Sequence, residues 1–240
     1  MTPEAADVAL KIQPIARVVS PYREKFGIPR QPGLVPAARG FLQMLPGYDN
    51  PKAFEGMEGF SHLWVIFGFH ECGGQWRLRV RPPRLGGNRE MGVFATRSPF
   101  RPNNLGLSVL LFDGLEDAEE GIRLKVSGLD LQDGTPVYDI KPYLPYVDSV
   151  PDALGGFANR EPEQKLAVEF SVQARGVLDS LADEGALQAL ISQSLALDPR
   201  PAYRRGESQE RTYGMRLGDY DVRWHVAGKQ VTVEQILPIR

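Results

Sequence analysis

The chain has 240 residues, with 28 Lys and Arg against 30 Asp and Glu, and a formal net charge of −2. This charge excludes attraction of nucleic acid by the protein as a whole, so any such binding would need a local basic patch. The single cysteine, Cys72, excludes an internal disulfide and a zinc site built from cysteines. The N-terminal segment lacks the apolar region of a signal peptide, and no apolar run approaches a membrane span, so we expect a cytoplasmic protein without a membrane partner.

The first part of the chain shows the spacing and the turn residues of a β protein. The whole chain contains 20 Pro and 25 Gly, which favour many turns. Strands are expected at 8–19, 40–45, 60–70, 75–81, 92–96, 105–112, 121–126 and 137–140, with no convincing helix among them. Residues 1 to about 150 are therefore predicted to form an all-β barrel or sandwich.

Four segments of this part carry more specific expectations. The run 60–70, FSHLWVIFGFH, is almost continuously apolar, which fits a strand buried on both faces or one in a barrel or an interface. In 75–81 apolar residues alternate with Gln and Arg, which predicts a half-buried strand with an outer row of arginines. The acidic segment 113–120 is most simply a solvated turn, and the prolines of 141–146 favour extended backbone.

The pattern changes in the last third of the chain. Residues 155–163 are predicted to be a linker, followed by a strand at 169–173. Apolar residues from 177 to 191 then recur at helical spacing, and Gly185 is expected to split or kink the helix. Further strands are expected at 213–217, 221–226 and 230–237. Residues 163–240 are therefore predicted to form a small α+β domain.

The stretch 81–104, RPPRLGGNREMGVFATRSPFRPNN, is the strongest candidate for a site. Its prolines and glycines exclude a helix and most of a central strand, so most of it is expected to be loop. It contains Arg81, Arg84, Arg89, Arg97 and Arg101, with Glu90 as the only carboxylate. Arginine forks match phosphates and base edges, so these loops are predicted to bind a ligand and not merely to confer solubility.

Several long motifs resemble the TrmO (YaeB, TsaA-like) family of S-adenosylmethionine-dependent tRNA methyltransferases. The motifs are SPYREKFGIPRQPGLV at 20–35, GMEGFSHLWVIFGFH at 56–70, VRPPRLGGN at 80–88, GVFATRSPFRPNNLGLS at 92–108, DLQDGTPVYDIKPYLPYVDS at 130–149 and DPRPAYRRG at 198–206. They follow the order of the family and span most of the chain. The last of them is similar to the longer bacterial members.

The resemblance implies a mainly β fold. Residues 1–155 would be an antiparallel β-barrel domain that binds S-adenosylmethionine and carries catalysis, and 163–240 a small α+β domain that contacts tRNA. The chain has neither a G-x-G-x-x-G loop nor a Walker A loop, which disfavours a Rossmann methyltransferase and agrees with a cofactor site on a barrel. The implied substrate is the anticodon arm of tRNA, where N6 of threonylcarbamoyladenosine at position 37 would accept a methyl group by in-line transfer.

The resemblance also implies which residues bind the cofactor. They are Pro32, Gly33, Leu34, His70, Glu71, Arg97, Leu107, Ser127, Gly128, Leu129 and Asp130. A guanidinium repels a sulfonium, so Arg97 should meet the methionyl carboxylate or the ribose side. Asp130 is expected to recognise the ribose or the adenine. Asp139 is the candidate that accepts the N6 proton.

The tRNA contacts are expected on the basic loops and in the second domain. The predicted residues are Arg84, Arg101, Asn103, Lys141, Tyr203, Arg204 and Arg205. Basic side chains beside a ring suit RNA backbone and unstacked bases, and Arg200 belongs to the same cluster in the sequence. No DNA partner is expected. His62, His70 and Cys72 have no matching second ligand cluster, so no metal site is predicted.

Two alternatives stay open from the residues alone. The basic loops also suit a non-catalytic RNA-binding adaptor without a cofactor pocket. A regulator that binds S-adenosylmethionine without transferring its methyl group is the second alternative. A homodimer with its active site near the subunit junction is expected as well, because the family forms one and because the apolar strand at 63–69 exceeds what one small barrel can cover.

Overall fold

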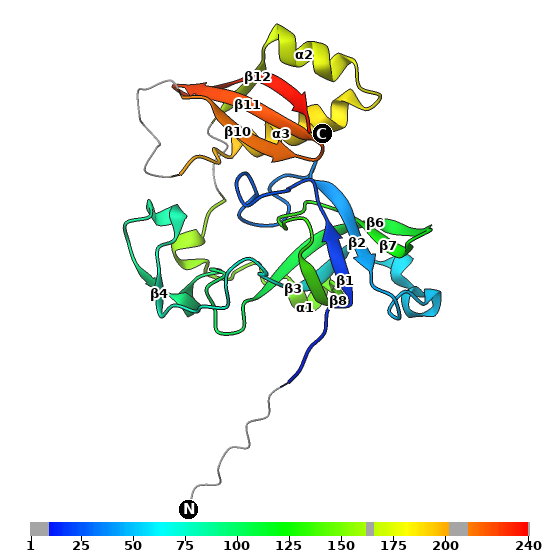
Figure 1. Cartoon of the computed structure of the whole chain (residues 1–240). Coiled ribbons are helices and arrows are strands. Elements are labelled where there is room, and N and C mark those ends of the chain that lie inside the picture. Colours follow the sequence, from blue (N-terminus) through cyan, green and yellow to red (C-terminus); the bar gives the residue numbers. More distant parts are fainter. Residues whose placement is uncertain (1–9, 162–165, 202–210, 240) are drawn as a thin grey trace, which may run out of the picture.

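A computed structural model describes residues 10–161, 166–201 and 211–239 (Figure 1). Six antiparallel strands pair in the order β1-β2-β7-β6-β3-β8, and β8 pairs with β1 to close a barrel. The strands are β1 (Ala16–Val19), β2 (Arg39–Met44), β3 (His62–Gly68), β6 (Leu105–Ala118), β7 (Gly121–Ser127) and β8 (Pro136–Pro142). The predicted mainly β fold with a smaller α+β part is confirmed.

Alternating side chains explain why these strands form a barrel. In β7, Ile122, Leu124 and Val126 point into the core, while the intervening Arg and Lys stay outside. The strand β3 follows the same rule. Leu63, Val65 and Phe67 are buried, whereas Trp64 and Ile66 remain partly exposed on the outer face. Of the alternatives for this apolar run, the description that fits a single chain is a barrel strand with an incompletely covered outer face.

The predicted turn at 113–120 is wrong for most of its length. Strand β6 continues to Ala118 and pairs with β7 through a register shift between Phe112 and Gly114. The acidic residues of this extension do not break the strand, and Glu116 lies opposite cations on the neighbouring strand. Glu116 contacts Arg123 at 2.9 Å and Lys125 at 3.4 Å.

The segment 71–104 leaves the barrel as an excursion, which we call the arginine arm. The strands expected at 75–81 and 92–96 shrink to β4 (Arg79–Val80) and β5 (Met91–Gly92), and 3-10 turns form at η3 (Pro83–Leu85) and η4 (Val93–Ala95). The apolar side of the predicted strand is not buried. The reason is that prolines and glycines keep this ribbon short, and none of the described strands forms a second sheet over it.

The segments around the barrel contain short helical turns. They are η1 (Pro51–Phe54), η2 (Met57–Gly59), α1 (Pro145–Asp148) and η5 (Gly156–Ala158). The expectation of extended backbone at 141–146 is wrong at its end, because Pro145 occupies the first position of α1, where proline is favourable. A carboxylate oxygen of Asp148 accepts bonds from the backbone N–H of Leu144 at 2.8 Å and from the indole of Trp64 at 2.9 Å.

The second unit is a four-stranded sheet with two helices, in the order β10-β11-β12-β9. Its elements are β9 (Ala167–Phe170), α2 (Val172–Asp179), α3 (Glu184–Ala196), β10 (Tyr213–Leu217), β11 (Tyr220–Ala227) and β12 (Gln230–Pro238). The expected strand at 169–173 ends early because Ser171 caps α2, its hydroxyl accepting from the N–H of Ala174 at 3.0 Å. The helix break precedes Gly185, which lies within α3.

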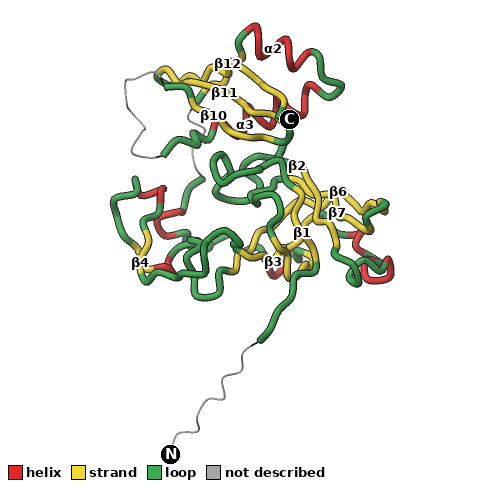
Figure 2. The backbone as a smooth tube through the Cα atoms, in the orientation of Figure 1, coloured by secondary structure: helices red, strands yellow, loops and turns green. Residues whose placement is uncertain are grey.

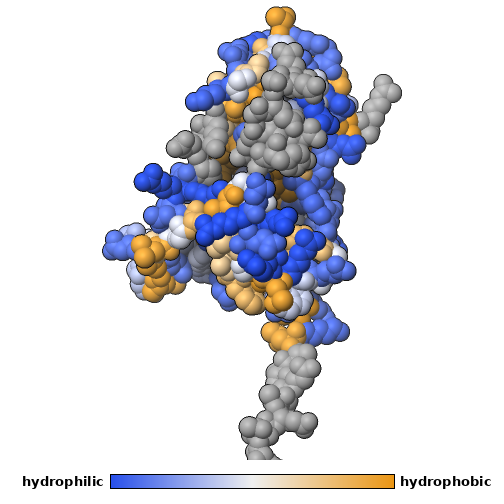
Figure 3. Space-filling model, turned by 90° about the vertical axis from the view of Figure 1, so that its left-hand side faces the viewer, coloured by the Kyte–Doolittle hydropathy of each residue, from blue (hydrophilic) through white to orange (hydrophobic). Residues whose placement is uncertain are grey.

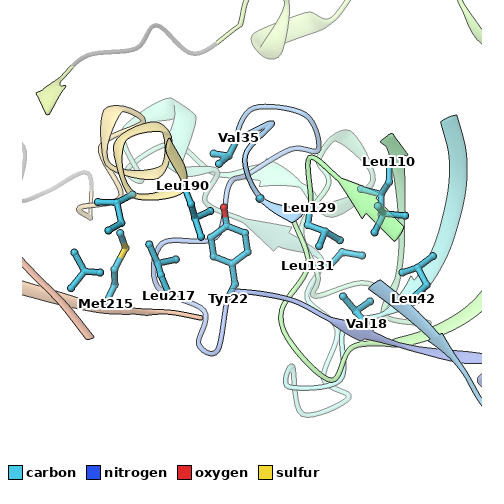
Figure 4. Packing of buried hydrophobic residues seen from close by; sticks show 14 of the residues in the cluster. Val18, Tyr22, Val35, Leu42, Leu110, Leu129, Leu131, Leu190, Met215 and Leu217 are labelled. Carbon is cyan, nitrogen blue, oxygen red and sulfur yellow. The ribbon is translucent and has the colours of Figure 1, made fainter. Parts of the chain in front are cut away.

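A loop of residues 20–38 lies between the two units (Figure 2). Buried residues of both units form one hydrophobic cluster, and the ring of Tyr22 is fully enclosed within it. Figure 4 shows this ring between Met215 and Leu217 of β10 on one side and Leu129 and Leu131 on the other. No helix in the described ranges is long and apolar enough to cross a membrane.

Candidate active site

Two glycine turns meet at the barrel end that faces the second unit. The N–H of Gly33 donates to the carbonyl of Gly128 at 2.9 Å, and both residues have positive φ, 77° and 73°. A Cβ on Gly128 would lie 3.1 Å from the Cα of Gly33, so the close contact and the positive φ both favour glycine here. The structure thereby brings together the turn of Pro32, Gly33 and Leu34 and the predicted cofactor residues Ser127 to Asp130.

Asp130 is the ionisable group at the centre of this end. The hydroxyl of Ser108 donates to its carboxylate at 2.8 Å. The residue keeps some exposed surface, but its carboxyl group is enclosed by protein, and this burial raises the pKa of Asp130 to about 6. The Ser108 hydrogen bond and the charge of Arg97 oppose the rise. A carboxyl group whose pKa is raised in this way, beside loops from distant parts of the chain, is a candidate functional group.

Arg97 lies beside the first of the two turns. Its guanidinium donates to the side-chain oxygen of Gln31, the residue before Pro32, and the rest of the side chain is exposed. Because its charge also acts on Asp130, a cation and a carboxyl group face the same region. Such a pair can bind a ligand that carries an anionic group and neutral hydroxyl or amino donors.

His70 and Glu71 follow β3 and reach the same end. The carboxylate of Glu71 accepts from Gln132 at 3.1 Å and pairs with Lys25 at 3.2 Å. The hydrogen bond from Lys25 is the main cause that holds the pKa of Glu71 below its usual value. Gln132 lies two residues after Asp130, so its hydrogen bond links Glu71 to the segment that follows the Ser127–Asp130 turn.

The outer face of the barrel carries Leu107 and Asp139 on either side of β3. Ile66 pairs with Leu107 of β6 and with Asp139 of β8, so the three side chains share one face. Leu107 is 51% exposed, which leaves an apolar surface on this outer face. The Asp139 carboxylate pairs with Lys141 at 3.0 Å, and no hydrogen bond or ion pair among the described residues ties it to the Asp130 group.

The arginines of the arm differ in how far they are engaged. Arg79 and Arg81 both pair with Glu90, at 3.5 and 3.2 Å. Arg101 donates to the carbonyl oxygens of Val93 and Thr96, so it holds the arm together. Arg84 and Asn103 are exposed, and Arg84 makes no hydrogen bond or ion pair with the described residues. Of these, Arg84 has the most freely available cation for a partner.

The cluster expected at 200–205 divides into two parts. Tyr203, Arg204 and Arg205 lie outside the described residues. Arg200 is buried, and its guanidinium donates to both carboxylate oxygens of Asp198 at 2.8 and 3.1 Å. Its expected membership of an exposed basic cluster is wrong, because its fork is already satisfied inside the protein.

Sequence reasoning missed three residues that organise the site: Gln31, Ser108 and Gln132. Ser108 had a signal, since it occupies an inward position of β6 among apolar neighbours, where a hydroxyl needs a partner. The amides of Gln31 and Gln132 had none, because their partners are distant in sequence. A separate cavity of about 420 Å³ is lined by Met44, Phe54, Leu63, Ile140 and neighbouring residues, none of them a predicted site residue.

Comparison with known proteins places these features in a family. A family model described as the tRNA-methyltransferase O N-terminal domain matches residues 17–149, and one described as the TrmO C-terminal domain matches residues 163–239. The chain is 47% identical over 220 residues to the Escherichia coli protein named tRNA (adenine(37)-N6)-methyltransferase, covering 91% of this chain and 94% of that protein.

Two further relatives extend the likeness. A Pseudomonas aeruginosa protein whose name describes an S-adenosylmethionine-dependent methyltransferase is 51% identical over 217 residues, which cover 89% of this chain and 91% of that protein. The crystal structure of TrmO from Pseudomonas aeruginosa superimposes with a TM-score of 0.79 at 42% identity, covering 95% of this chain and 98% of that one.

Proposed function

The chain belongs to the tRNA-methyltransferase O family, and on that premise we propose that it is an S-adenosylmethionine-dependent methyltransferase acting on N6 of adenine 37 in tRNA. The observation that carries the proposal is the joining of Gly33, Gly128, Arg97 and Asp130 at one end of the barrel. The motifs that share these residues lie far apart in the sequence, and a cofactor spanning them would explain why they converge.

The chemistry of these residues fits S-adenosylmethionine. Arg97 offers a fork for the methionyl carboxylate, and the ionised Asp130 carboxylate offers an acceptor for a ribose hydroxyl or the adenine amine. The Gly33 and Gly128 turns allow a flat group to approach the backbone closely. Pro32, Leu34, His70, Glu71, Leu107, Ser127 and Leu129 complete the proposed pocket.

The protein's own part in the reaction is positioning and proton removal. When bound, S-adenosylmethionine supplies a methyl group on a sulfonium leaving group that needs no further activation. Adenine N6 is a poor nucleophile because its lone pair is delocalised, so its proton must be accepted as the new N–C bond forms. We propose Asp139 as the acceptor. Its carboxylate pairs with Lys141 at 3.0 Å, and it lies on the face of the barrel that also carries Leu107.

The finer substrate is proposed to be N6-threonylcarbamoyladenosine at position 37, methylated by in-line transfer. The carbamoyl group withdraws electron density but also makes the N6 proton more acidic, which eases its removal. Alignment of donor and acceptor in one site is worth up to roughly 7–11 kcal/mol in well-positioned reactions. The cytoplasm, where tRNA is abundant, is the proposed location.

The two units are proposed to divide the work. The barrel, residues 1–155, would bind the cofactor and carry catalysis, and 163–240 would contact the anticodon arm with Tyr203, Arg204 and Arg205. Arg84, Arg101, Asn103 and Lys141 would add contacts from the barrel side. A homodimer is supported by the outer face of the barrel, where Leu107 and Leu111 are 51% and 40% exposed.

Mass spectrometry of tRNA nucleosides tests this function. A strain lacking the gene should lose the N6-methyl form of threonylcarbamoyladenosine and regain it with the parent sequence but not with Arg97→Ala. Calorimetry with S-adenosylmethionine separates the alternatives, since an RNA adaptor would not bind the cofactor. Cofactor binding without any change in the nucleosides would identify a regulator and contradict the proposal.

A further inference from the structure

The arginine arm exposes large apolar side chains that a single chain would ordinarily cover. Trp76 is 48% exposed, Leu78 73% and Phe94 72%. The backbone brings their segments together: the N–H of Val93 donates to the carbonyl of Leu78 at 3.0 Å, and the N–H of Arg77, the residue after Trp76, donates to the carbonyl of Phe100 at 3.1 Å. Figure 3 looks onto this side of the molecule and shows apolar side chains beside strongly hydrophilic ones.

The charge around these side chains is almost entirely positive. From 75 to 101 the sequence contains Arg77, Arg79, Arg81, Arg84, Arg89, Arg97 and Arg101, and Glu90 is its only carboxylate. Two of the arginines lie against rings of the arm: Arg77 is 4.4 Å from the centroid of Phe100, and Arg101 is 5.7 Å from that of Phe94. An occupant of this surface must therefore be anionic and must also present apolar faces.

We propose that Trp76 and Phe94 stack on unpaired bases of the tRNA anticodon loop. This inference rests on the proposed function and adds the side chains that receive the bases. Single-stranded RNA combines a phosphate chain with flat, unpaired bases, which is the combination the arm can meet with arginines and exposed rings. Phe94 precedes Arg97 by three residues, so a base held there would lie close to the proposed cofactor site.

A second copy of the chain suits the arm less well. In a two-fold contact the same surface meets itself, so two copies of the segment 75–101 would bring fourteen arginines together against two carboxylates. Like charges at such short range are unfavourable. Contact with a second copy is therefore an outcome that the test must be able to reveal.

The test compares ring loss with charge loss in full-length protein. Fluorescence anisotropy measures the affinity for an anticodon stem-loop RNA and for a fully paired RNA duplex over a range of salt. Trp76→Ala and Phe94→Ala should each weaken stem-loop binding by roughly fivefold to 150-fold. The slope of log Kd against log salt should not change, because no phosphate contact is lost. Arg84→Ala should lower that slope by about 0.7 to 0.9.

The controls separate stacking from other causes. Phe94→Tyr should keep the parent affinity, whereas Phe94→Leu, which remains apolar but has no ring, should behave like Phe94→Ala. Tyr48 is 41% exposed and lies outside the arm, so Tyr48→Ala is the matched control and should bind normally. Because all of these rings are exposed, the melting temperatures should stay close to that of the parent.

Three results would overturn the inference. The first is stem-loop affinity equal to that of the parent in the Trp76→Ala/Phe94→Ala double variant. The second is a loss of affinity for the paired duplex as large as that for the stem-loop. The third is a changed sedimentation coefficient of the double variant without RNA, which would assign the rings to a protein contact. The proposed function fails separately, if the parent binds the stem-loop through these rings but transfers no methyl group to tRNA.

Discussion

The side-chain carbonyl of Gln193 on α3 accepts a hydrogen bond of 2.9 Å from the backbone N–H of Ala37, 156 residues earlier in the chain. Ala37 ends the loop that contains the Pro32–Leu34 turn. The same loop is held at its start, where the N–H of Gly218 donates to the carbonyl of Pro21 at 2.7 Å. The second unit therefore fixes both ends of a loop that the barrel uses for its proposed cofactor site.

Gln193→Ala should weaken S-adenosylmethionine binding without touching the cofactor. The change removes the acceptor of the Ala37 N–H, which costs about 1 kcal/mol or somewhat more and loosens the turn. We expect a severalfold rise in Kd by calorimetry and an unchanged kcat at saturating cofactor. Gln188, exposed on the same helix, provides the matched control, and an equal effect of Gln188→Ala would show that the helix and not the hydrogen bond is responsible.

Asp130→Asn should make the protein more stable at neutral pH. Burial raises the pKa of Asp130 to about 6, so the folded state favours the protonated form more than the unfolded state does. Stability should fall as the pH rises from about 4 to 6, and the lost stability should stay lost above that range. The Asn variant lacks this loss and should gain up to about 3 kcal/mol at pH 7, as measured by urea unfolding at several pH values.

The same variant should bind S-adenosylmethionine less well. If the ionised carboxylate accepts a hydrogen bond from the cofactor, parent affinity should increase as the pH passes about 6. Asp130→Asn should be weaker by about 1.5–3 kcal/mol at pH 7 and should show no such increase. A pH-independent parent affinity would remove the ionised form of Asp130 from the site.

Arg97→Ala should weaken S-adenosylmethionine binding by about 1.5–3 kcal/mol, the contribution of a hydrogen bond to a charged group. Its side chain is exposed and bonds only to Gln31 among the described partners, so stability should change by less than about 0.5 kcal/mol. Calorimetry and thermal unfolding check both parts. Arg89→Ala, an exposed arginine of the same arm, should leave cofactor affinity unchanged.

Two arginines of the arm should respond differently to removal. Arg84→Ala should lower tRNA affinity and its salt dependence while leaving cofactor binding intact, because Arg84 is exposed. Arg101→Ala should weaken both ligands, because Arg101 holds the carbonyls of Val93 and Thr96 just before Arg97. Filter binding with tRNA and calorimetry with cofactor distinguish the two. Arg204→Ala/Arg205→Ala should lower tRNA affinity alone.

The barrel could be predicted from the sequence because strands such as β1, β3 and β7 bury alternate residues. The same alternation at 75–81 predicted a half-buried strand, of which only β4 forms. A pattern of apolar and charged residues does not show whether a neighbouring sheet covers the apolar side. The prediction for the acidic end of β6 was wrong because a neighbouring strand does exist there. Glu116 was expected in a turn, but in the sheet it has Arg123 and Lys125 across the ladder.

The candidate site was predictable as a set of motifs but not as an arrangement. The turns at Gly33 and Gly128 could be named from glycine in a turn context, yet their mutual hydrogen bond depends on the closed barrel. The raised pKa of Asp130 follows from enclosure by distant segments, which composition does not encode. Arg200 shows the limit most clearly, because an arginine in a basic run is normally exposed and here it is buried with Asp198.

An isolated β-bridge joins Tyr22 of the 20–38 loop to Leu217 of β10, so the second unit depends on the first to cover one of its strands. Strand β10 is an edge of its sheet, and open edges invite pairing with other chains. In the intact protein the 20–38 loop, between β1 and β2, occupies part of that edge, and Leu217 is fully buried. A fragment starting after residue 160 would leave the edge free, so expression of the second unit alone should favour aggregation, and shortening the 20–38 loop should do the same in the full chain.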